Sequence, residues 1–340
     1  MRETDFNQLI KTLKGKRAPF SVVFELTRRC NLKCLHCYLP DGRTGGEDEL
    51  DLAEIRTVLD DLAKAGCLKL TLTGGEPTLR KDFSKIYSYS QEKGFAITLF
   101  TNGTLLTPGV RKILLKAPPL AVECSLYGAT PGIHDRITRS PGSFDLSIGT
   151  IQWLKTKGIP TIVKSVILSM NLQEIDNLQN LCRGLGVPFH PTFRVFSSLD
   201  PGRSPERWRI KTREIRDLLR RETLPFFRSP EALDPGHEDW ICNAGRQACS
   251  ISAEGKVYPC VALRWESGDL REASFQEIWS HSPVLKTIRS YQEKDFKTCI
   301  RCPWKQECRF CPGMGFFENG NMLKPSKEMC RMTKVISPLE

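Results

Sequence analysis

Three cysteines stand close together near the start of the chain, within TRRCNLKCLHCYLP at residues 27–40. Cys30, Cys34 and Cys37 follow the spacing C-x3-C-x2-C, and no fourth cysteine comes close behind. A structural zinc site and an ordinary four-iron cluster both take four protein ligands. The local run offers three thiols, so its chemistry depends on what fills the fourth position. His36 could complete a zinc site, but it adjoins Cys37 and is poorly placed to join the same tetrahedron.

A second group of cysteines crowds the final third of the chain, from Pro235 onward. Its eight members are Cys242, Cys249, Cys260, Cys299, Cys302, Cys308, Cys311 and Cys330. The segment CIRCPWKQECRFC contains two tight pairs, C-x2-C-x5-C-x2-C, which on their own are typical of a zinc ribbon. The stretch CNAGRQACSISAEGKVYPC predicts a hairpin that turns at Glu254–Gly255 and delivers Cys260.

The cysteine content also bears on cellular location. The N-terminal residues MRETDFNQLIKTLKGKRAP are too polar for a secretory signal, and no run of about 18 apolar residues occurs. We therefore expect a cytoplasmic protein without a membrane segment, in which fourteen cysteines favour metal or redox chemistry over disulfides. Cys67, Cys124 and Cys182 lie outside both groups and are predicted to be small core residues.

The elements that must position the first cysteines alternate along the first two-thirds of the chain. Six β-type runs are predicted as strands, at residues 20–26, 68–73, 95–100, 120–126, 161–168 and 189–196. Amphipathic helices are predicted between them, near residues 51–65, 80–92, 107–116, 143–157 and 172–184. This alternation predicts parallel βα units in a partial or full barrel, and a length of 340 residues suggests two domains.

Four polar or glycine-bearing loops follow the first four predicted strands. They are the cysteine loop, TGGEPTL at 73–79, TNGTLL at 101–106 and CSLYGAT at 124–130. Chemistry in such barrels belongs at the carboxyl ends of the strands, so these loops should share one rim. Glycines there let the backbone approach a ligand closely, and the Glu76 carboxylate suits a cationic group such as an amine.

The cysteine spacing after the first strand, with GGEP after the second, resembles the radical S-adenosylmethionine superfamily. The resemblance implies a partial (β/α)6 TIM-like barrel in which Cys30, Cys34 and Cys37 hold a [4Fe–4S] cluster. The amino and carboxylate groups of S-adenosylmethionine would ligate the fourth iron, which answers the question of the missing ligand. The resemblance also implies a 5′-deoxyadenosyl radical that abstracts a hydrogen from the substrate. It further implies an electron donor such as flavodoxin or ferredoxin.

The resemblance also implies a set of residues that contact S-adenosylmethionine: Gly74, Gly75, Glu76, Pro77, Asn102, Ser125 and His36. Relatives often carry an arginine where HDRITR has Thr138, so Arg139 or Lys164 would supply the cation for the carboxylate of S-adenosylmethionine. The alternative is that both are surface charges. That alternative stays open.

The fourth strand carries two candidate catalytic residues. Glu123, Ser125 and Tyr127 share strand parity and should face the barrel lumen together. Tyr127 replaces the acidic residue that is usual in the corresponding motif of the family. Glu123 and Tyr127 are therefore the candidates for catalysis, and for Glu123 a structural ion pair is an equal alternative.

The C-terminal cysteines, with Gly255 four residues before Cys260 and with ASFQEIWSHSP at 273–283, resemble the SPASM extension of radical S-adenosylmethionine enzymes. This resemblance implies two auxiliary [4Fe–4S] clusters, and three clusters in all. Their expected ligands are Cys242, Cys249, Cys260 and Cys311 for the first, and Cys299, Cys302, Cys308 and Cys330 for the second. The expected boundaries are an extension at 1–19, the barrel at 20–200, a linker helix at 201–234 and the SPASM domain at 235–340.

A net charge of +11 raises the question of nucleic acid, but the basic residues are spread out. Their densest run, at residues 203–222, is predicted to be a helix capped by Ser204, with Pro205 in its first turn. Its apolar stripe would comprise Trp208, Ile215, Leu218 and Leu219. The positive charge of this run indicates either a solvated helix face or a surface that binds an acidic partner. No segment of the sequence resembles an RNA-binding module.

The favoured function is the oxidative modification of a peptide or protein side chain, as in thioether or carbon–carbon crosslinks of ribosomally made peptides. Auxiliary clusters suit this chemistry because a second electron must leave after hydrogen abstraction. Only about 19 residues precede the first strand, so a separate protein would recognise the leader of a precursor peptide. The alternatives are a cofactor-biosynthetic or other small-molecule radical enzyme, such as a decarboxylase or dehydrogenase, and a radical enzyme that modifies RNA.

Overall fold

In a computed structural model of the chain, residues 18–40, 48–220, 242–308 and 310–337 are described. Their first half is built on six parallel strands that neighbour one another in chain order. The strands are β1 Ser21–Glu25, β2 Lys69–Thr73, β3 Ala96–Thr101, β4 Ala121–Ser125, β5 Thr161–Val166 and β6 Phe189–Thr192. The predicted parallel sheet is confirmed, although the last strand ends at Thr192, four residues before the predicted end.

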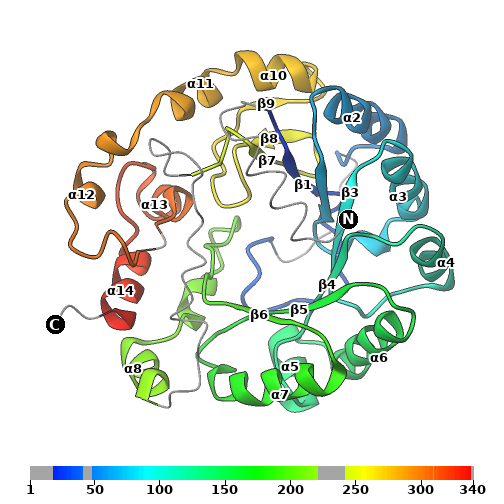
Figure 1. Ribbon diagram of the computed structural model, residues 1–340, viewed down its shortest axis with the longest axis horizontal. Helices are drawn as coiled ribbons and strands as arrows, with labels where there is room; N and C mark the ends of the chain where they lie inside the picture. Colours follow the sequence, from blue (N-terminus) through cyan, green and yellow to red (C-terminus); the bar gives the residue numbers. More distant parts are fainter. Residues whose placement is uncertain (1–17, 41–47, 221–241, 309, 338–340) are drawn as a thin grey trace.

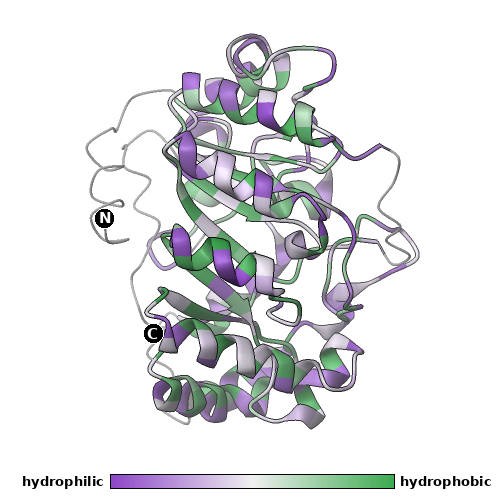
Figure 2. Ribbon diagram, turned by 90° about the vertical axis from the view of Figure 1, so that its right-hand side faces the viewer, coloured by the Kyte–Doolittle hydropathy of each residue, from purple (hydrophilic) through white to green (hydrophobic). Residues whose placement is uncertain are grey.

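The outer helices follow the predicted positions closely. They are α2 Leu52–Lys64, α3 Phe83–Glu92, α4 Pro108–Lys116, α6 Ser143–Thr156 and α7 Ile175–Leu185. Helix α2 begins with a capping box between Asp51 and Glu54, and helix α4 begins where the Thr107 hydroxyl accepts from the Val110 N–H. Hydrophobic and hydrophilic residues alternate along the outer helices (Figure 2), so each helix has an apolar face to pack on the sheet.

One helix was not predicted. Helix α5, Pro131–Thr138, covers most of the HDRITR segment and ends at Arg139. Arg139 has a φ of 57°, and no other non-glycine residue among those described has a positive φ. The carbonyls of Ile137 and Thr138 accept from the N–H groups of Leu35 and Lys33, at 2.9 and 3.0 Å. The end of this helix therefore holds the cysteine loop.

The C-terminal cysteine region is joined to the barrel through the sheet. Strand β7, Ala248–Ile251, pairs in parallel with β1, and β8, Lys256–Tyr258, and β9, Gly268–Asp269, continue the sheet. The strand order is β6-β5-β4-β3-β2-β1-β7-β8-β9. The hairpin predicted at Glu254–Gly255 is confirmed, because β7 and β8 are antiparallel across it. The two regions thus share one sheet, and the proposed boundary between them stays a prediction.

Short helices complete a ring around this sheet. They are α10 Phe275–His281, α11 Pro283–Ser290, α12 Lys297–Ile300, α13 Pro312–Asn319 and α14 Lys327–Ile336. In Figure 1 they run from α2 round the upper and left sides to α8, Thr212–Arg220. Arg331 of α14 donates to the Ile210 carbonyl at 2.8 Å and to the Thr212 hydroxyl at 3.1 Å. These bonds close the ring beside β6.

The predicted basic helix at 203–222 is only partly correct. The structure breaks it into a 3₁₀ turn at Pro205–Trp208 and helix α8, and the Ser204 side chain caps neither. The Arg209 guanidinium donates to the Val195 carbonyl at 2.7 Å, which ties the break to the chain after β6. Ile215 and Leu218 are buried as predicted. The rest of the expected linker, residues 221–234, and residues 1–17 of the expected extension lie outside the described residues.

The main apolar cluster lies between the sheet and the outer helices. Cys67, Cys124 and Cys182 belong to it and are buried, which confirms them as core residues. None of the helices formed by the described residues is long and apolar enough to cross a bilayer.

Candidate active site

The first cysteine loop lies at the carboxyl end of β1, beside the end of β4. The Leu32 N–H donates to the Cys30 sulfur at 3.4 Å, and the Cys37 N–H donates to the Cys34 carbonyl at 3.2 Å. Burial raises the pKa of Tyr127 far above its usual value, and the charges of all three cysteines raise it further. The structure thus gathers the three thiols around one tyrosine.

The glycines of the GGEP loop are required by the cysteine loop itself. A Cβ on Gly74 would lie 2.3 Å from the Thr27 carbonyl oxygen, and one on Gly75 would lie 2.2 Å from that of Arg29. The Gly75 N–H donates to Thr27 at 2.7 Å, and the Glu76 N–H donates to Arg29 at 2.8 Å. These bonds continue the β1–β2 pairing into the loops. The glycines therefore let two backbones meet, whereas the sequence predicted a backbone approach to a ligand.

The Glu76 carboxylate faces protein donors. One oxygen accepts from the hydroxyls of Thr78 and Thr101 at 2.7 and 2.9 Å, and the other accepts from the Asn102 N–H at 2.7 Å. The residue is fully buried, and burial raises the pKa of its carboxyl. The predicted contact of this carboxylate with an amine stays a prediction. In the structure, the oxygens of Glu76 join the loops after β2 and β3.

Asn102 links the third loop to the cysteines. Its amide donates to the Asn31 side-chain carbonyl at 2.9 Å, and its nitrogen lies 3.9 Å from the Cys30 sulfur. The Thr104 hydroxyl bonds both asparagines, at 2.6 and 2.7 Å. Asn102 is a predicted site residue, whereas Asn31 and Thr104 were not identified from the sequence. The position of Asn31 between two of the cysteines was the available signal.

The two candidate polar residues of β4 and β5 bind each other. The Lys164 ammonium pairs with the Glu123 carboxylate and lies 4.0 Å from the centre of the Phe100 ring. Glu123 is 7% exposed, so the structural ion pair, one of the two predicted alternatives, is present. Arg139, the other candidate cation, is exposed at the end of α5, where its neighbour Thr138 holds the cysteine loop.

Tyr127 forms a buried wall behind the cysteine loop. Its N–H donates to Nδ1 of His134 at 3.1 Å, and its ring meets that of His36 edge-on at 4.5 Å. Burial lowers the pKa of His134 to about 4, so this imidazole is neutral at physiological pH. The predicted site residues His36 and Tyr127 therefore pack together.

A buried polar network was not identified from the sequence. The Glu25 carboxylate, 4% exposed at the end of β1, accepts from the Tyr38 hydroxyl and from the Arg264 guanidinium. The guanidinium also lies over the Tyr38 ring, 5.5 Å from its centre. Tyr38 adjoins the last cysteine of the loop, and Arg264 comes from the C-terminal region. The only indication in the sequence was the position of Glu25 in its strand, because side chains alternate between the two faces and this position faces the lumen.

Four C-terminal thiols gather around α12 and α14. Burial raises the pKa of Cys299 to about 11, and the charges of Cys330, Cys308 and Cys302 contribute to that rise. These are the four ligands predicted for the second auxiliary cluster, and a set of four thiolates suits an iron–sulfur cluster. Their assignment as ligands stays a prediction.

The other predicted four-cysteine set is divided. Burial raises the pKa of Cys260 to about 12, and Cys242 and Cys311 are the neighbouring charges that raise it further. Cys249, by contrast, is 1% exposed and belongs to the main apolar cluster between sheet and helices. Cys260 is nevertheless among the charges that raise the pKa of Cys249, and the assignment of these four cysteines as ligands stays a prediction.

The geometry of the described side chains also bears on whether they could hold a single metal ion. Within residues 18–40, 48–220, 242–308 and 310–337, no three His, Cys, Asp or Glu side chains are arranged to hold one metal ion. A four-iron cluster spreads its thiolates farther apart than zinc does, because each thiolate binds a different iron.

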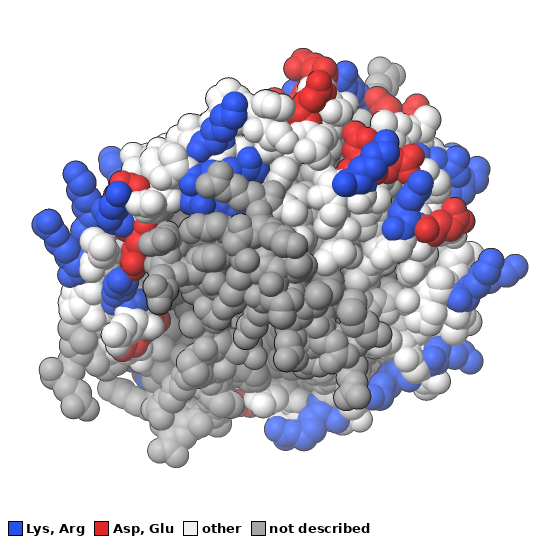
Figure 3. All heavy atoms as spheres, turned by 45° about the horizontal axis from the view of Figure 1, so that its top comes forward, with Lys and Arg blue, Asp and Glu red and all other residues white. Residues whose placement is uncertain are grey.

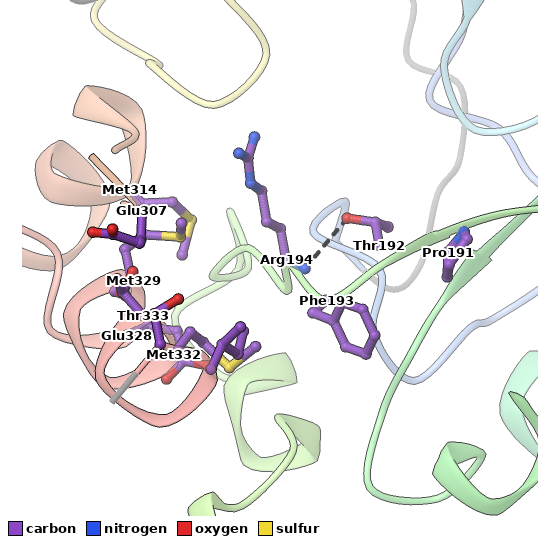
Figure 4. A pocket seen from close by; sticks show the side chains of 12 residues that line it. Pro191, Thr192, Phe193, Arg194, Glu307, Met314, Glu328, Met329, Met332 and Thr333 are labelled. Carbon is purple, nitrogen blue, oxygen red and sulfur yellow. Dashed lines mark hydrogen bonds between the residues drawn. The ribbon is translucent and has the colours of Figure 1, made fainter. Parts of the chain in front are cut away.

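A cavity of about 210 Å³ lies between the end of β6 and helices α13 and α14. Figure 4 shows Arg194 on one side of it, with its N–H donating to the Thr192 hydroxyl at 3.4 Å, and Met314, Met329 and Met332 on the other. The charge of Arg194 lowers the pKa of Cys242, which opposes the effect of burial. The cavity therefore lies near the C-terminal thiols.

The charges on one face of the molecule are mixed where its residues are described. On the face drawn in Figure 3, Lys and Arg side chains are scattered and interleaved with Asp and Glu. This agrees with the expectation from the sequence that the basic residues are spread out.

Two family models match the chain. The model of the radical SAM superfamily matches residues 24–183, and that of the SPASM iron–sulfur cluster-binding domain matches residues 242–303. The first runs from the end of β1 through β5 to α7, and the second covers the hairpin and the helices up to α12.

The similar proteins include a heme synthase and a mycofactocin maturase. An AdoMet-dependent heme synthase of Methanosarcina barkeri is 30% identical over 90% of this chain and 95% of its own length. The mycofactocin maturase MftC of Mycolicibacterium smegmatis is 28% identical over 89% of this chain and 81% of its own length. Among solved structures, Streptococcus suis SuiB bound to its precursor peptide SuiA has the same fold, with a TM-score of 0.73 and 18% identity. That alignment covers 96% of this chain and 80% of SuiB.

Proposed function

This chain belongs to the radical SAM superfamily and carries a SPASM domain, and on that premise we propose that it oxidises a side chain of a ribosomally made peptide. Membership in the two families implies S-adenosylmethionine and iron–sulfur clusters as cofactors; three [4Fe–4S] clusters and a thioether or carbon–carbon product are part of the proposal. One observation supports this proposal most strongly. Three thiols lie at the barrel rim, separate from the C-terminal thiols, and both groups are attached to one continuous sheet.

The residues of the rim fit the binding of S-adenosylmethionine on a cluster. Cys30, Cys34 and Cys37 would hold the cluster, and bound S-adenosylmethionine supplies a 5′-deoxyadenosyl radical. The backbone of residues 74–77 would bind its amino end, together with the side chains of Asn102, Ser125 and His36. Arg139 and Lys164 remain the two candidates for its carboxylate, and the Lys164 ammonium is also paired with Glu123.

The residues of the chain position the reacting groups and exclude water from the site. Glu76 holds the second and third loops together, and the end of α5 holds the cysteine loop. Tyr127 is 7% exposed and its raised pKa keeps the phenol protonated, so it seals the site behind the thiols without adding charge. Such a site protects a reactive radical from solvent. Glu123 and Tyr127 remain the candidates for catalysis.

The C-terminal thiols would serve the second half of an oxidation. Hydrogen abstraction removes one electron with the hydrogen, and closing a new bond requires the loss of a second electron. Thiolate sets such as Cys299, Cys302, Cys308 and Cys330 suit clusters that accept it. A flavodoxin or ferredoxin would reduce the rim cluster, and we place the enzyme in the cytoplasm, where such donors and free thiols occur together.

Support for a peptide substrate comes from two directions. The maturase MftC resembles this chain along nearly its whole length, and the SuiB structure that shares its fold was solved with a precursor peptide. The net charge of +11 would attract an acidic leader, with or without a separate recognition protein. Nothing observed favours a nucleic-acid partner.

A small-molecule substrate is the second candidate. The observation that favours it is the 30% identity with an AdoMet-dependent heme synthase over 95% of that protein's length. In this alternative the enzyme would act on a tetrapyrrole or another small cofactor precursor with the same rim and the same thiol sets.

The test is co-expression of the enzyme with each short peptide encoded beside its gene, followed by mass spectrometry. We expect a peptide two hydrogens lighter, and no such product when Cys30, Cys34 and Cys37 are all replaced by Ala. An unchanged mass with altered stereochemistry would indicate epimerisation instead. If no peptide changes while an iron porphyrin precursor is consumed by the purified enzyme, the small-molecule alternative replaces the peptide proposal.

A further inference from the structure

Two neighbouring outer helices of the barrel leave apolar side chains uncovered. Four large hydrophobic side chains are exposed among the described residues, and two of them lie on α4 and α6. They are Leu115 of α4, 47% exposed, and Leu146 of α6, 57% exposed. Figure 1 shows these helices next to each other on the outside of the barrel. A single exposed leucine is ordinary, but two on adjacent helices indicate a surface that a partner covers.

A groove of about 680 Å³ lies between these helices. Its lining residues are Leu106, Pro108, Arg111, Lys112, Leu115 and Trp153. The Arg111 guanidinium lies over the Trp153 ring, 4.9 Å from its centre, and Nε donates to the Leu106 carbonyl at 3.1 Å. These contacts hold the start of α4 against α6. Leu146 precedes Trp153 by seven residues, about two helical turns, so both lie on the same side of α6.

The edges of the groove carry positive charge. The basic residues of α4 and α6 outnumber their acidic residues by four to one: Arg111, Lys112, Lys116 and Lys155 against Asp145. Lys112 and Lys116 are exposed, and within the described part of the chain neither ammonium forms an ion pair. Apolar side chains beside unpaired ammonium groups suit an acidic protein partner.

Helix α6 separates this surface from the rim thiols. The Ser147 hydroxyl, next to the exposed Leu146, donates to the Asn102 carbonyl at 2.8 Å. The side-chain nitrogen of Asn102 lies 3.9 Å from the Cys30 sulfur. An α-helix with its side chains is about 10–12 Å across. A partner seated on the outer side of α6 is therefore one helix away from the loop that holds the rim cluster.

We infer that the groove between α4 and α6, together with Leu146, is the docking surface for a small acidic electron-transfer protein that reduces the rim cluster. We call it the α4–α6 surface. One electron leaves the reduced flavin or iron–sulfur centre of the donor and enters the rim cluster, and no bond is formed. The inference rests on the proposed function, which requires such a donor.

The position of the surface favours an electron donor over a precursor peptide. An electron needs no open path through α6, whereas a side chain that is to be modified must itself reach the radical. Electron-transfer complexes also have small interfaces, and charge complementarity speeds their encounter. An open groove with an apolar centre and basic edges has these properties.

The first test compares two reductants in the reconstituted holoenzyme. Purified flavodoxin in its fully reduced form is the protein donor, and dithionite is a small donor that needs no docking surface. The double variant Lys112→Glu with Lys116→Glu should slow flavodoxin-driven cleavage of S-adenosylmethionine about tenfold at low donor concentration, because charge reversal weakens a steered encounter. Dithionite-driven cleavage should be unchanged. Equal rates for the variant and the unmodified protein with flavodoxin, or equal losses with both reductants, would overturn the inference.

A matched control has the same change of net charge elsewhere. Lys286 and Lys324 are exposed residues of the C-terminal region. Lys286→Glu with Lys324→Glu should leave flavodoxin-driven cleavage unchanged. Equal slowing in both double variants would mean that only the net charge of the enzyme matters, and the α4–α6 surface would lose its assignment.

The apolar part of the surface is tested separately. Leu115→Ser with Leu146→Ser should fold normally, because both side chains are exposed. Calorimetry at high salt, where the attraction between charges is screened, should show flavodoxin affinity about threefold weaker or less. Unchanged affinity would mean that no contact forms at these leucines and would contradict docking.

Hydrogen exchange measured by mass spectrometry locates the contact without turnover. Flavodoxin should slow exchange in α4 and α6 and leave α10 and α11 unchanged. Protection of α10 and α11 instead, or protection of α4 and α6 by a precursor peptide or a second copy of the enzyme but not by flavodoxin, would overturn the inference. If the reductant and exchange results are as expected while no peptide is altered, only the proposed function fails. If peptides are oxidised but flavodoxin protects neither helix, only the docking surface is wrong.

Discussion

The cysteine loop after β1 and the C-terminal cysteines are held in different ways. The loop is fixed by backbone bonds to distant parts of the chain, from Lys33 to Thr138 and from Gly75 to Thr27. In the C-terminal region, the N–H groups of Cys299, Cys302, Cys308 and Cys330 donate to carbonyls only three or four residues earlier, as the Cys37 N–H does within the loop, so the contrast lies in the loop's additional bonds to distant segments.

This difference indicates which region depends on its metal. The barrel rim is positioned by a sheet and helices that bury a large apolar core, so it should fold with or without a cluster. The C-terminal thiols are carried by short helices with local bonds, and metal ligation then contributes directly to their folding. Four predictions test or sharpen that contrast, from the largest expected effect to the smallest.

The largest effect is expected from removing the thiols of the rim. Replacing Cys30, Cys34 and Cys37 together with Ala should remove about four irons and abolish cleavage of S-adenosylmethionine, since those thiolates anchor the reactive cluster. The fold should persist, because the loop keeps its backbone bonds to β2 and α5. Iron analysis, chromatography of 5′-deoxyadenosine and circular dichroism check these outcomes. Residual cleavage at more than one per cent of the normal rate would contradict the assignment of the three ligands.

The second prediction concerns the C-terminal thiols. Cys308→Ala should leave cleavage of S-adenosylmethionine detectable while product formation is lost, because the rim cluster is separately ligated. Hydrogen exchange measured by mass spectrometry should become faster in α12 to α14 and stay unchanged in β1 to β5. Equal acceleration in both regions would show that the barrel also depends on this metal site. Cys182→Ala, a core cysteine of α7, is the control for loss of a thiol without loss of a cluster.

The third prediction concerns the contact between the two regions. Arg264→Met should lower the free energy of unfolding by about 3–5 kcal/mol, because it leaves the buried Glu25 carboxylate without its cation. Urea denaturation of the anaerobic protein, followed by circular dichroism, measures the change.

A matched control is available for that ion pair. Arg271→Met breaks an exposed pair with Glu54 at 3.0 Å and should cost less than about 1 kcal/mol. Similar losses in both variants would mean that the network of Glu25, Tyr38 and Arg264 does not join the regions energetically.

The smallest effect is expected at the GGEP loop. Gly75→Ala should lower the free energy of unfolding by about 1–3 kcal/mol, because the new Cβ would clash with the backbone of Arg29. It should also slow cleavage of S-adenosylmethionine at least tenfold, since the cysteine loop must move away. Gly149→Ala in α6 meets no atom within 4 Å and should be neutral or stabilise the protein by up to about 1 kcal/mol. Normal cleavage in Gly75→Ala would show that this backbone contact does not position the cluster.

Much of the architecture was predictable because short sequence patterns determine it. Apolar runs of strand length separated by amphipathic helices located β1 to β5 within two residues at each end, and cysteine spacing located the candidate clusters. The unpredicted helix α5 has a physical cause, since Pro131 and Gly132 open it and its apolar residues are few. The sixth strand ends at Thr192 because its partner β5 ends at Val166, directly opposite.

By itself, then, the sequence determined the family, the parallel sheet and the residues that bring thiols to one rim. The tertiary structure decided how distant segments meet. The register of β7 against β1 joins residues 227 positions apart, since Val22 pairs with Cys249, and it turns that cysteine into the core. The Glu25–Arg264 contact likewise spans 239 positions. Periodicity reports which face of an element is apolar, but pairing across such separations depends on the whole fold, so only the assembled sheet shows which distant residues become neighbours.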